Sequence, residues 1–73
     1  MARAELVSEV TGKVWKIALQ PGASVQEGDA VMILESMKME IPIEATASGM
    51  LVEICVAEDD QVEEDQVVAI IEY

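Results

Sequence analysis

The chain has 73 residues, enough for one small domain, and it contains one cysteine and no histidine. This composition excludes an intramolecular disulfide and leaves zinc chemistry almost no ligands, and the lone cysteine fits a reducing, cytoplasmic compartment. Fifteen acidic side chains against four basic ones give a net charge of −11, which argues against nucleic acid or an anionic membrane as a partner. No basic stretch is followed by an apolar run, so we expect neither a secretion signal nor a membrane span.

Short apolar runs separated by turn residues predict an all-β chain with essentially no helix. In chain order, the expected strands are Leu6-Val7, 14–19, 31–34, 39–45, 51–56 and 67–71. Residues 1–5 are expected to be mobile, because they precede the first strand at a chain end. Pro42 predicts either an edge strand or a place among the first residues of its strand, since proline cannot donate a hydrogen bond to a neighbouring strand.

The sequence repeats itself with a shift of 37 residues. Residues 12–35 align with residues 49–72 without a gap, and seven of the 24 pairs are identical: Gly12/Gly49, Ile17/Ile54, Val25/Val62, Glu27/Glu64, Val31/Val68, Ile33/Ile70 and Glu35/Glu72. Each half alone would expose an apolar face, so two halves packed against each other with pseudo-twofold symmetry are the expected architecture. We therefore predict one domain over residues 1–73, with repeat halves of about 4–35 and 41–72.

The repeat also predicts the core. Apolar positions retained in both halves are expected to face inward, namely Val14, Ile17, Leu19, Val25, Val31 and Ile33 with Leu51, Ile54, Val56, Val62, Val68 and Ile70. The three-residue steps 14–17 and 51–54 break strict alternation. They predict a bulge or bend near Trp15 and Val52, which lets a strand cross between sheets.

Two further features of the repeat concern the backbone. Gly12 and Gly49 lie just before the bulged strands, where a positive φ or a close approach of another backbone is expected. In the second half, Glu58, Asp59 and Asp65 replace the residues of the first-half turns, which are Pro21, Gly22 and Gly28. The sequence therefore leaves the tightness of the second-half turns open.

Lys38 lies in the connection between the two halves, within Glu35-Ser36-Met37-Lys38-Met39-Glu40. A lysine in a tight turn is most often a solvated charge that keeps a sheet edge soluble. Met37 and Met39 favour a different interpretation, because a solubilising turn would take Asn, Asp, Gly or Ser, and exposed methionines form an adaptable contact surface. One amine displayed between two methionines suits covalent modification.

The remaining candidates have simpler explanations. Cys55 is expected to be a structural or half-exposed thiol, because no histidine is available to activate it. Trp15 is expected to be a packing or bend residue. The acidic runs 58–60 and 63–65 lack the order of a calcium loop, so a solvated acidic face is the better interpretation. Such a face would steer docking to basic partner surfaces. Lys13 and Lys16 are expected to remain unmodified.

The hexapeptide around Lys38 resembles the attachment motif of biotinyl domains, the carriers of biotin-dependent carboxylases and decarboxylases. The resemblance spans nearly the whole chain, since further positions match the family: Gly22, Val25, Gly28, Ala45 and Gly49. It implies an all-β fold, a flattened eight-strand barrel or sandwich of two four-stranded antiparallel sheets with the lysine on an exposed hairpin. Lipoyl domains share this biotinyl/lipoyl fold but usually show Asp-Lys-Ala at the turn, so Met37 and Met39 favour biotin.

The resemblance implies a function as a biotin carboxyl carrier. A biotin protein ligase would join biotin to Lys38, with Met37 and Met39 as recognition residues, and the arm would carry carboxybiotin between biotin carboxylase and carboxyltransferase components. The carrier itself would not be an enzyme, and we expect a free-standing protein that is monomeric when free. A carrier of lipoate, or of both groups, is the nearest alternative, and an unmodified β-barrel adaptor is the other.

Overall fold

The computed structural model describes residues 2–73, and every regular element in this range is a β-strand. The strands are β1 (Arg3–Val7), β2 (Gly12–Ile17), β3 (Ser24–Val25), β4 (Ala30–Ser36), β5 (Met39–Glu44), β6 (Gly49–Ile54), β7 (Gln61–Val62) and β8 (Val67–Glu72). Over the same range, no helix is long and apolar enough to cross a membrane.

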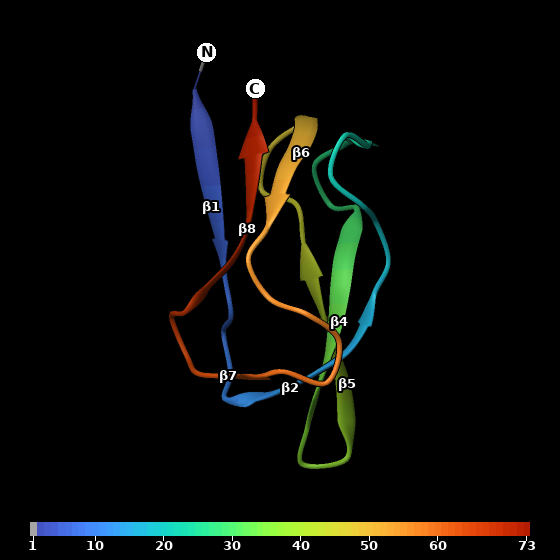
Figure 1. The fold of residues 1–73 in the computed structure, drawn as a ribbon, viewed down its shortest axis with the longest axis vertical. Helices are drawn as coiled ribbons and strands as arrows, with labels where there is room; N and C mark the ends of the chain where they lie inside the picture. Colours follow the sequence, from blue (N-terminus) through green and yellow to red (C-terminus); the bar gives the residue numbers. More distant parts are fainter. Residues whose placement is uncertain (1) are drawn as a thin grey trace.

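The strands form two antiparallel sheets of four strands each. Sheet A has the order β1-β8-β6-β3 and sheet B the order β5-β4-β2-β7, so each sheet combines strands of both repeat halves. In Figure 1 the blue β1 and the red β8, from opposite ends of the chain, lie side by side. The molecule measures 36 × 19 × 18 Å, with the β4–β5 hairpin at one end of the long axis and the start of β1 and the end of β8 at the other. The predicted fold class is confirmed.

The hydrogen bonds between the halves obey the predicted pseudo-twofold symmetry. The amide of Gly22 donates to the carbonyl of Leu51 at 2.7 Å, and the amide of Asp59, its repeat equivalent, donates to the carbonyl of Val14 at 2.7 Å. A second pair of bonds is related in the same way. The amide of Gly28 donates to the carbonyl of Ala45 at 2.8 Å, and the amide of Asp65, its repeat equivalent, donates to the carbonyl of Ser8 at 2.7 Å. The symmetry therefore extends four residues before Gly12, to a part of the repeat that sequence identity does not mark.

The second-half turns keep the conformation of the first-half turns although they lack glycine. Gly22 and Gly28 have φ of 96° and 93°, and their equivalents Asp59 and Asp65 have φ of 75° and 70°. Aspartate tolerates this left-handed region better than most residues, because its short polar side chain can bond locally. The question that the sequence left open is thus answered: all four turns are tight.

Both predicted bulges are present. The register of β2 against β4 shifts between Val14 and Lys16, and that of β6 against β8 shifts between Leu51 and Glu53. The extra residues are therefore Trp15 and Val52, as the broken alternation indicates. Each bulge increases the local twist, which bends the strand along the barrel.

The core is formed by buried apolar residues from both sheets, which are Leu6, Val14, Val25, Val31, Met32, Leu34, Ile43, Ala45, Leu51, Val62, Val68, Ala69 and Ile71. Four of the predicted core residues, Ile17, Leu19, Ile54 and Val56, are partly buried and pack against this cluster.

The predicted inward orientation of Ile33 and Ile70 is wrong. Both are only partly buried, whereas their neighbours Leu34 and Ile71 are fully buried. In the register of sheet B, Met32 and Leu34 alternate toward the core, so Ile33 lies on the opposite face. Runs of four or five consecutive apolar residues contain no alternation from which the sequence could reveal this choice.

The beginning of the chain is ordered where mobility was expected. Arg3–Val7 pairs along its length with β8. The amide of Ala2 donates to the carbonyl of Tyr73 at 2.9 Å, and the amide of Tyr73 donates to the carbonyl of Ala2 at 2.8 Å. The prediction of mobility is wrong for residues 2–5, and Met1 lies outside the described residues. The sequence also did not predict the two-residue strands β3 and β7, which are too short to show a pattern.

Pro42 lies within β5, opposite Ile33, and β5 is an edge strand of sheet B. Of the two alternatives that the sequence allowed for Pro42, the edge strand is confirmed. An edge position tolerates proline because one side of the strand forms no ladder hydrogen bonds.

Few ion pairs compensate the acidic charge. Within residues 2–73 two are present, Arg3 Nε to Glu72 Oε2 at 3.3 Å and Lys13 Nζ to Asp59 Oδ1 at 3.6 Å. Both lie at the surface, where such pairs contribute about 0–1 kcal/mol.

Because so little of the acidic charge is paired, we expect sodium chloride to raise the melting temperature by screening the repulsion among carboxylates, as measured by circular dichroism. A flat or falling response would mean that the carboxylates are already compensated.

Candidate functional site

Lys38 lies at the tip of the β4–β5 hairpin, in a loop of two residues. Ser36 pairs with Met39, which leaves Met37 and Lys38 as the loop, with φ of 51° and 64°. Two consecutive positive φ angles are the requirement of the type I′ turn, which natural hairpins usually meet with Asn-Gly. For residues that carry a larger side chain, the left-handed conformation costs about 1–2 kcal/mol each.

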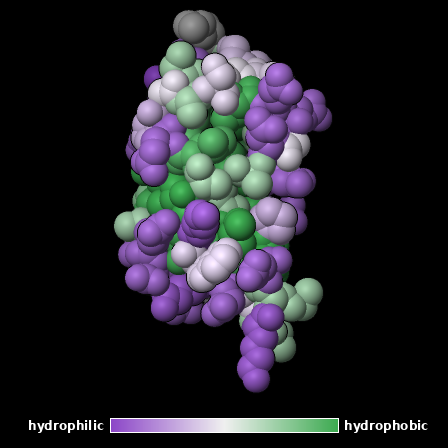
Figure 2. All heavy atoms as spheres, turned by 90° about the vertical axis from the view of Figure 1, so that its right-hand side faces the viewer, coloured by the Kyte–Doolittle hydropathy of each residue, from purple (hydrophilic) through white to green (hydrophobic). Residues whose placement is uncertain are grey.

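The hairpin presents its tip to solvent. Lys38 is exposed, and the exposed fractions of Met37 and Met39 are 91% and 64%. In Figure 2 the hairpin projects beyond the lower end of the molecule, away from the hydrophobic atoms visible in the middle of that face. The structure thus brings the three predicted site residues together, with the amine in water and two apolar side chains beside it.

The base of the hairpin is held by the loop before β2. The hydroxyl of Ser36 donates to the carbonyl of Thr11 at 2.9 Å, and the hydroxyl of Thr11 accepts a bond from the amide of Glu64 at 3.4 Å. A β-carbon on Gly12 would lie 2.6 Å from the carbonyl oxygen of Glu35, so only glycine permits this approach. Sequence reasoning anticipated the role of Gly12 but missed Ser36 and Thr11, because their contacts join segments 25 and 53 residues apart.

A row of charged side chains lies behind the tip on the outer face of sheet B. Lys13 of β2 is opposite Glu35 of β4, and Glu35 is opposite Glu40 of β5. Two carboxylates directly opposite each other repel, and Lys13 partly offsets this repulsion. The tip therefore projects from a base with a local negative charge.

Replacing Met37 by asparagine and Lys38 by glycine is expected to stabilise the fold by about 1–2 kcal/mol, because both residues adopt positive φ at lower cost. The melting temperature should rise by roughly 4–8 °C per kcal/mol, as measured by circular dichroism. Met39→Asn is the control, since Met39 is exposed but does not have a positive φ. A double variant no more stable than this control would contradict the strain in the loop.

The other candidate residues lie apart from the hairpin tip. Cys55 is free and exposed. Partial desolvation and the carboxylates of Glu53 and Glu5 raise the pKa of its thiol, which makes it a poor nucleophile at neutral pH. Trp15 occupies the bulge, as predicted, but its side chain is 49% exposed and does not pack in the core.

The acidic runs are exposed, and two of their carboxylates accept hydrogen bonds from backbone amides. Glu58 Oε2 accepts a bond from the amide of Ile17 at 3.0 Å, and Asp60 Oδ2 accepts one from the amide of Ala57 at 2.9 Å. In the part of the chain that the structure describes, no group of three or more acidic or cysteine side chains is arranged to hold a metal ion.

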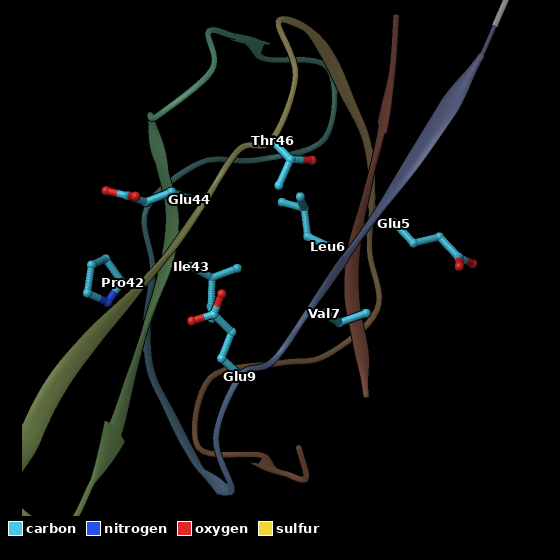
Figure 3. A pocket seen from close by; sticks show the side chains of 8 residues that line it. All are labelled: Glu5, Leu6, Val7, Glu9, Pro42, Ile43, Glu44 and Thr46. Atoms are coloured by element: carbon cyan, nitrogen blue, oxygen red, sulfur yellow. The ribbon is translucent and has the colours of Figure 1, made fainter. Parts of the chain in front are cut away.

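A shallow groove of about 110 Å³ separates the free edges of β1 and β5. Its lining consists of four repeat-related pairs, Glu5/Pro42, Leu6/Ile43, Val7/Glu44 and Glu9/Thr46, so the groove lies on the pseudo-twofold axis. Figure 3 shows Leu6 and Ile43 pointing toward each other across it. Its volume suits one side chain and is below the roughly 300–1,000 Å³ of typical cofactor pockets.

Comparison with known proteins places this geometry in a family. Residues 2–71 match the biotin/lipoyl family model described as "Biotin-requiring enzyme". The chain is 44% identical over 59 residues to the biotin/lipoyl attachment protein of Bacillus subtilis (strain 168), covering 81% of each chain. It is 31% identical over 64 residues to a biotinylated protein homologue of Mycobacterium leprae, covering 88% of this chain and 90% of the relative.

A solved structure agrees with the sequence relatives. The crystal structure of urea carboxylase from Kluyveromyces lactis superposes with a TM-score of 0.94 and 39% identity, over 99% of this chain. The match covers only 6% of that much longer enzyme. The family match, the two sheets and the lysine hairpin lead to one conclusion: the chain belongs to the biotin/lipoyl attachment domain family.

Proposed function

We propose that this protein is a biotin carboxyl carrier and that Lys38 is the site of covalent biotin attachment. The observation that carries the proposal is the exposed lysine on a strained two-residue hairpin between two exposed methionines. The similarity to a biotinylated mycobacterial protein and to a domain-sized part of urea carboxylase supports biotin and a carboxylase system.

The attachment step requires an accessible, deprotonated amine. Exposed lysine amines are mostly protonated at neutral pH, so a biotin protein ligase would supply both the base and the activated acyl group. The Lys38 nitrogen would attack the carbonyl carbon of biotinyl-adenylate. The amide C–N bond forms, the bond from carbon to the phosphate oxygen breaks, AMP leaves and one proton is released. Met37 and Met39 would give the ligase an adaptable apolar surface on each side of the amine.

The attached arm would work by tethering. When bound, biotin supplies a ureido nitrogen that holds a carboxyl group between a biotin carboxylase site and a carboxyltransferase site. A long lysine arm on a two-residue loop keeps that group close to both sites, at an effective concentration on the order of millimolar. In this proposal the protein is a cytoplasmic carrier that is monomeric when free, catalyses no step itself, and binds neither nucleic acid nor membrane.

Intact-mass spectrometry after expression with an active biotin ligase tests the proposal. We expect one biotinyl group per chain, no modification in Lys38→Arg, and full modification in the Lys13→Arg and Lys16→Arg controls. A lipoyl mass instead of a biotinyl mass would establish the lipoate carrier. An unmodified parent chain, with no streptavidin signal in either the parent or Lys38→Arg, would favour the adaptor.

A further inference from the structure

The outer face of sheet B carries an apolar strip with one free lysine. The register aligns Lys16 of β2, Ile33 of β4 and Pro42 of β5 in one row, and Trp15 bulges out beside it. We call these four residues the Trp15 face. Pro42 and Lys16 are exposed, Ile33 is half-buried and the tryptophan is half-exposed, so the strip is accessible to another protein.

The repeat provides an internal comparison, because sheet A has an equivalent face. There the aligned row is Glu53, Ile70 and Glu5, and the bulge residue is Val52. The central isoleucine is the same, but two carboxylates replace the lysine and the proline, and valine replaces the tryptophan. One backbone geometry therefore carries two different surfaces, and the fold does not require a tryptophan or a lysine at these positions.

Charge further distinguishes the Trp15 face. Of the basic residues on the sheets, Arg3 and Lys13 are paired with carboxylates, whereas Lys16 forms no ion pair within residues 2–73. A partner surface that carries a carboxylate would be repelled by most of this protein, whose net charge is −11. It would be attracted at this face, and that contrast orients an encounter.

The Trp15 face is continuous with the lysine hairpin. Ile33 and Ser36 lie on β4 about 10 Å apart, given a rise of about 3.3 Å per residue, and Lys38 is two residues further along the chain. Pro42 lies on β5, the second strand of the same hairpin. A protein that holds Lys38 in its active site can therefore contact the Trp15 face with the surface beside that site.

We propose that the Trp15 face is the docking surface for the enzyme that acylates Lys38. Trp15 would enter an apolar pocket of that enzyme, and Lys16 would pair with a carboxylate at the rim of the pocket. Tryptophan is enriched among residues whose truncation costs most binding energy. This enzyme must hold the Lys38 amine itself in its active site, so the surface beside that site lies next to the Trp15 face. A carboxylase site binds the end of the biotin arm instead, at a greater distance from the sheet.

The experiment measures initial rates of biotin incorporation by a purified biotin protein ligase, with biotin and ATP, at varied carrier concentration. Trp15→Val, which installs the repeat-equivalent residue, is expected to raise KM about tenfold with little change in kcat. Lys16→Glu is expected to raise KM about fivefold. The controls are Val52→Ala and Glu53→Lys on the equivalent face, for which KM should stay within about twofold of the parent value.

A double variant separates local contact from net charge. Lys16→Glu combined with Glu53→Lys keeps the net charge at −11, because it exchanges one lysine and one glutamate. If docking is local, its KM stays as high as that of Lys16→Glu alone, and a return to the parent value would overturn the proposal. Parental KM in Trp15→Val, or a loss confined to kcat, would also overturn it.

The inference rests on the proposed function, and the two fail differently. If the parent chain accepts no biotin at any concentration, the carrier function fails. If the parent is biotinylated and the face variants match it, only the docking surface fails. Melting curves of each variant show whether a change in KM reflects unfolding.

Discussion

Replacing Gly49 with alanine is expected to lower the free energy of unfolding by about 3 kcal/mol, because the added carbon collides with backbone. A β-carbon at this position would lie 2.1 Å from the carbonyl oxygen of Glu72 and 3.0 Å from its carbon. Those atoms belong to β8, in the middle of sheet A, so relief requires separating two paired strands. The melting temperature should fall by roughly 12–24 °C, as measured by circular dichroism.

Two glycine variants serve as controls for this clash. Gly12→Ala is expected to be less harmful, because its β-carbon would lie 2.6 Å from the carbonyl oxygen of Glu35. Gly22→Ala should cost about 1–2 kcal/mol, since its φ of 96° is unfavourable for alanine but no atom lies within 4 Å of the added carbon. Equal losses in Gly49→Ala and Gly22→Ala would show that strand contact does not determine the cost.

Ile71→Ala is expected to destabilise the protein by about 3–4 kcal/mol, whereas Ile70→Ala should cost about 1 kcal/mol. The two residues are adjacent on β8 and chemically identical, but Ile71 is fully buried in the core and Ile70 lies half-buried on the outer face. Urea denaturation of both variants measures the difference. Similar losses would restore the inward orientation of Ile70 that the sequence predicts.

This pair marks the point at which sequence periodicity stops being informative. Val14 and Leu51 were assigned correctly, because Lys13 marks the outer face beside Val14 and Leu51 is the repeat equivalent of Val14. The continuous runs 31–34 and 67–71 contain no polar marker. Their orientation is decided by the partner strands and by register shifts at Val31 in β4 and at its repeat equivalent Val68 in β8, which only the folded chain specifies.

The position of the lysine turn could be predicted from the sequence, whereas its surroundings could not. Lys38 stands out because it joins two repeated halves and because Met37 and Met39 are unusual turn residues. The support of its hairpin was not predictable, because Ser36 reaches Thr11 across the fold. Trp15 occupies the bulge as expected, but its exposure was not predicted. The sequence gives the position of a bulge, but whether its side chain enters the core depends on the neighbouring layer.

The amino-acid pattern by itself determined the duplication, the all-β class, both bulges and the location of the lysine turn. These features depend on residues near one another in the chain or on the comparison of the two halves. Tertiary structure decided the pairing of β1 with β8, the short strands β3 and β7, and the left-handed turns at Asp59 and Asp65. Each of these depends on hydrogen bonds between the halves, which form only when one half has the other to pack against.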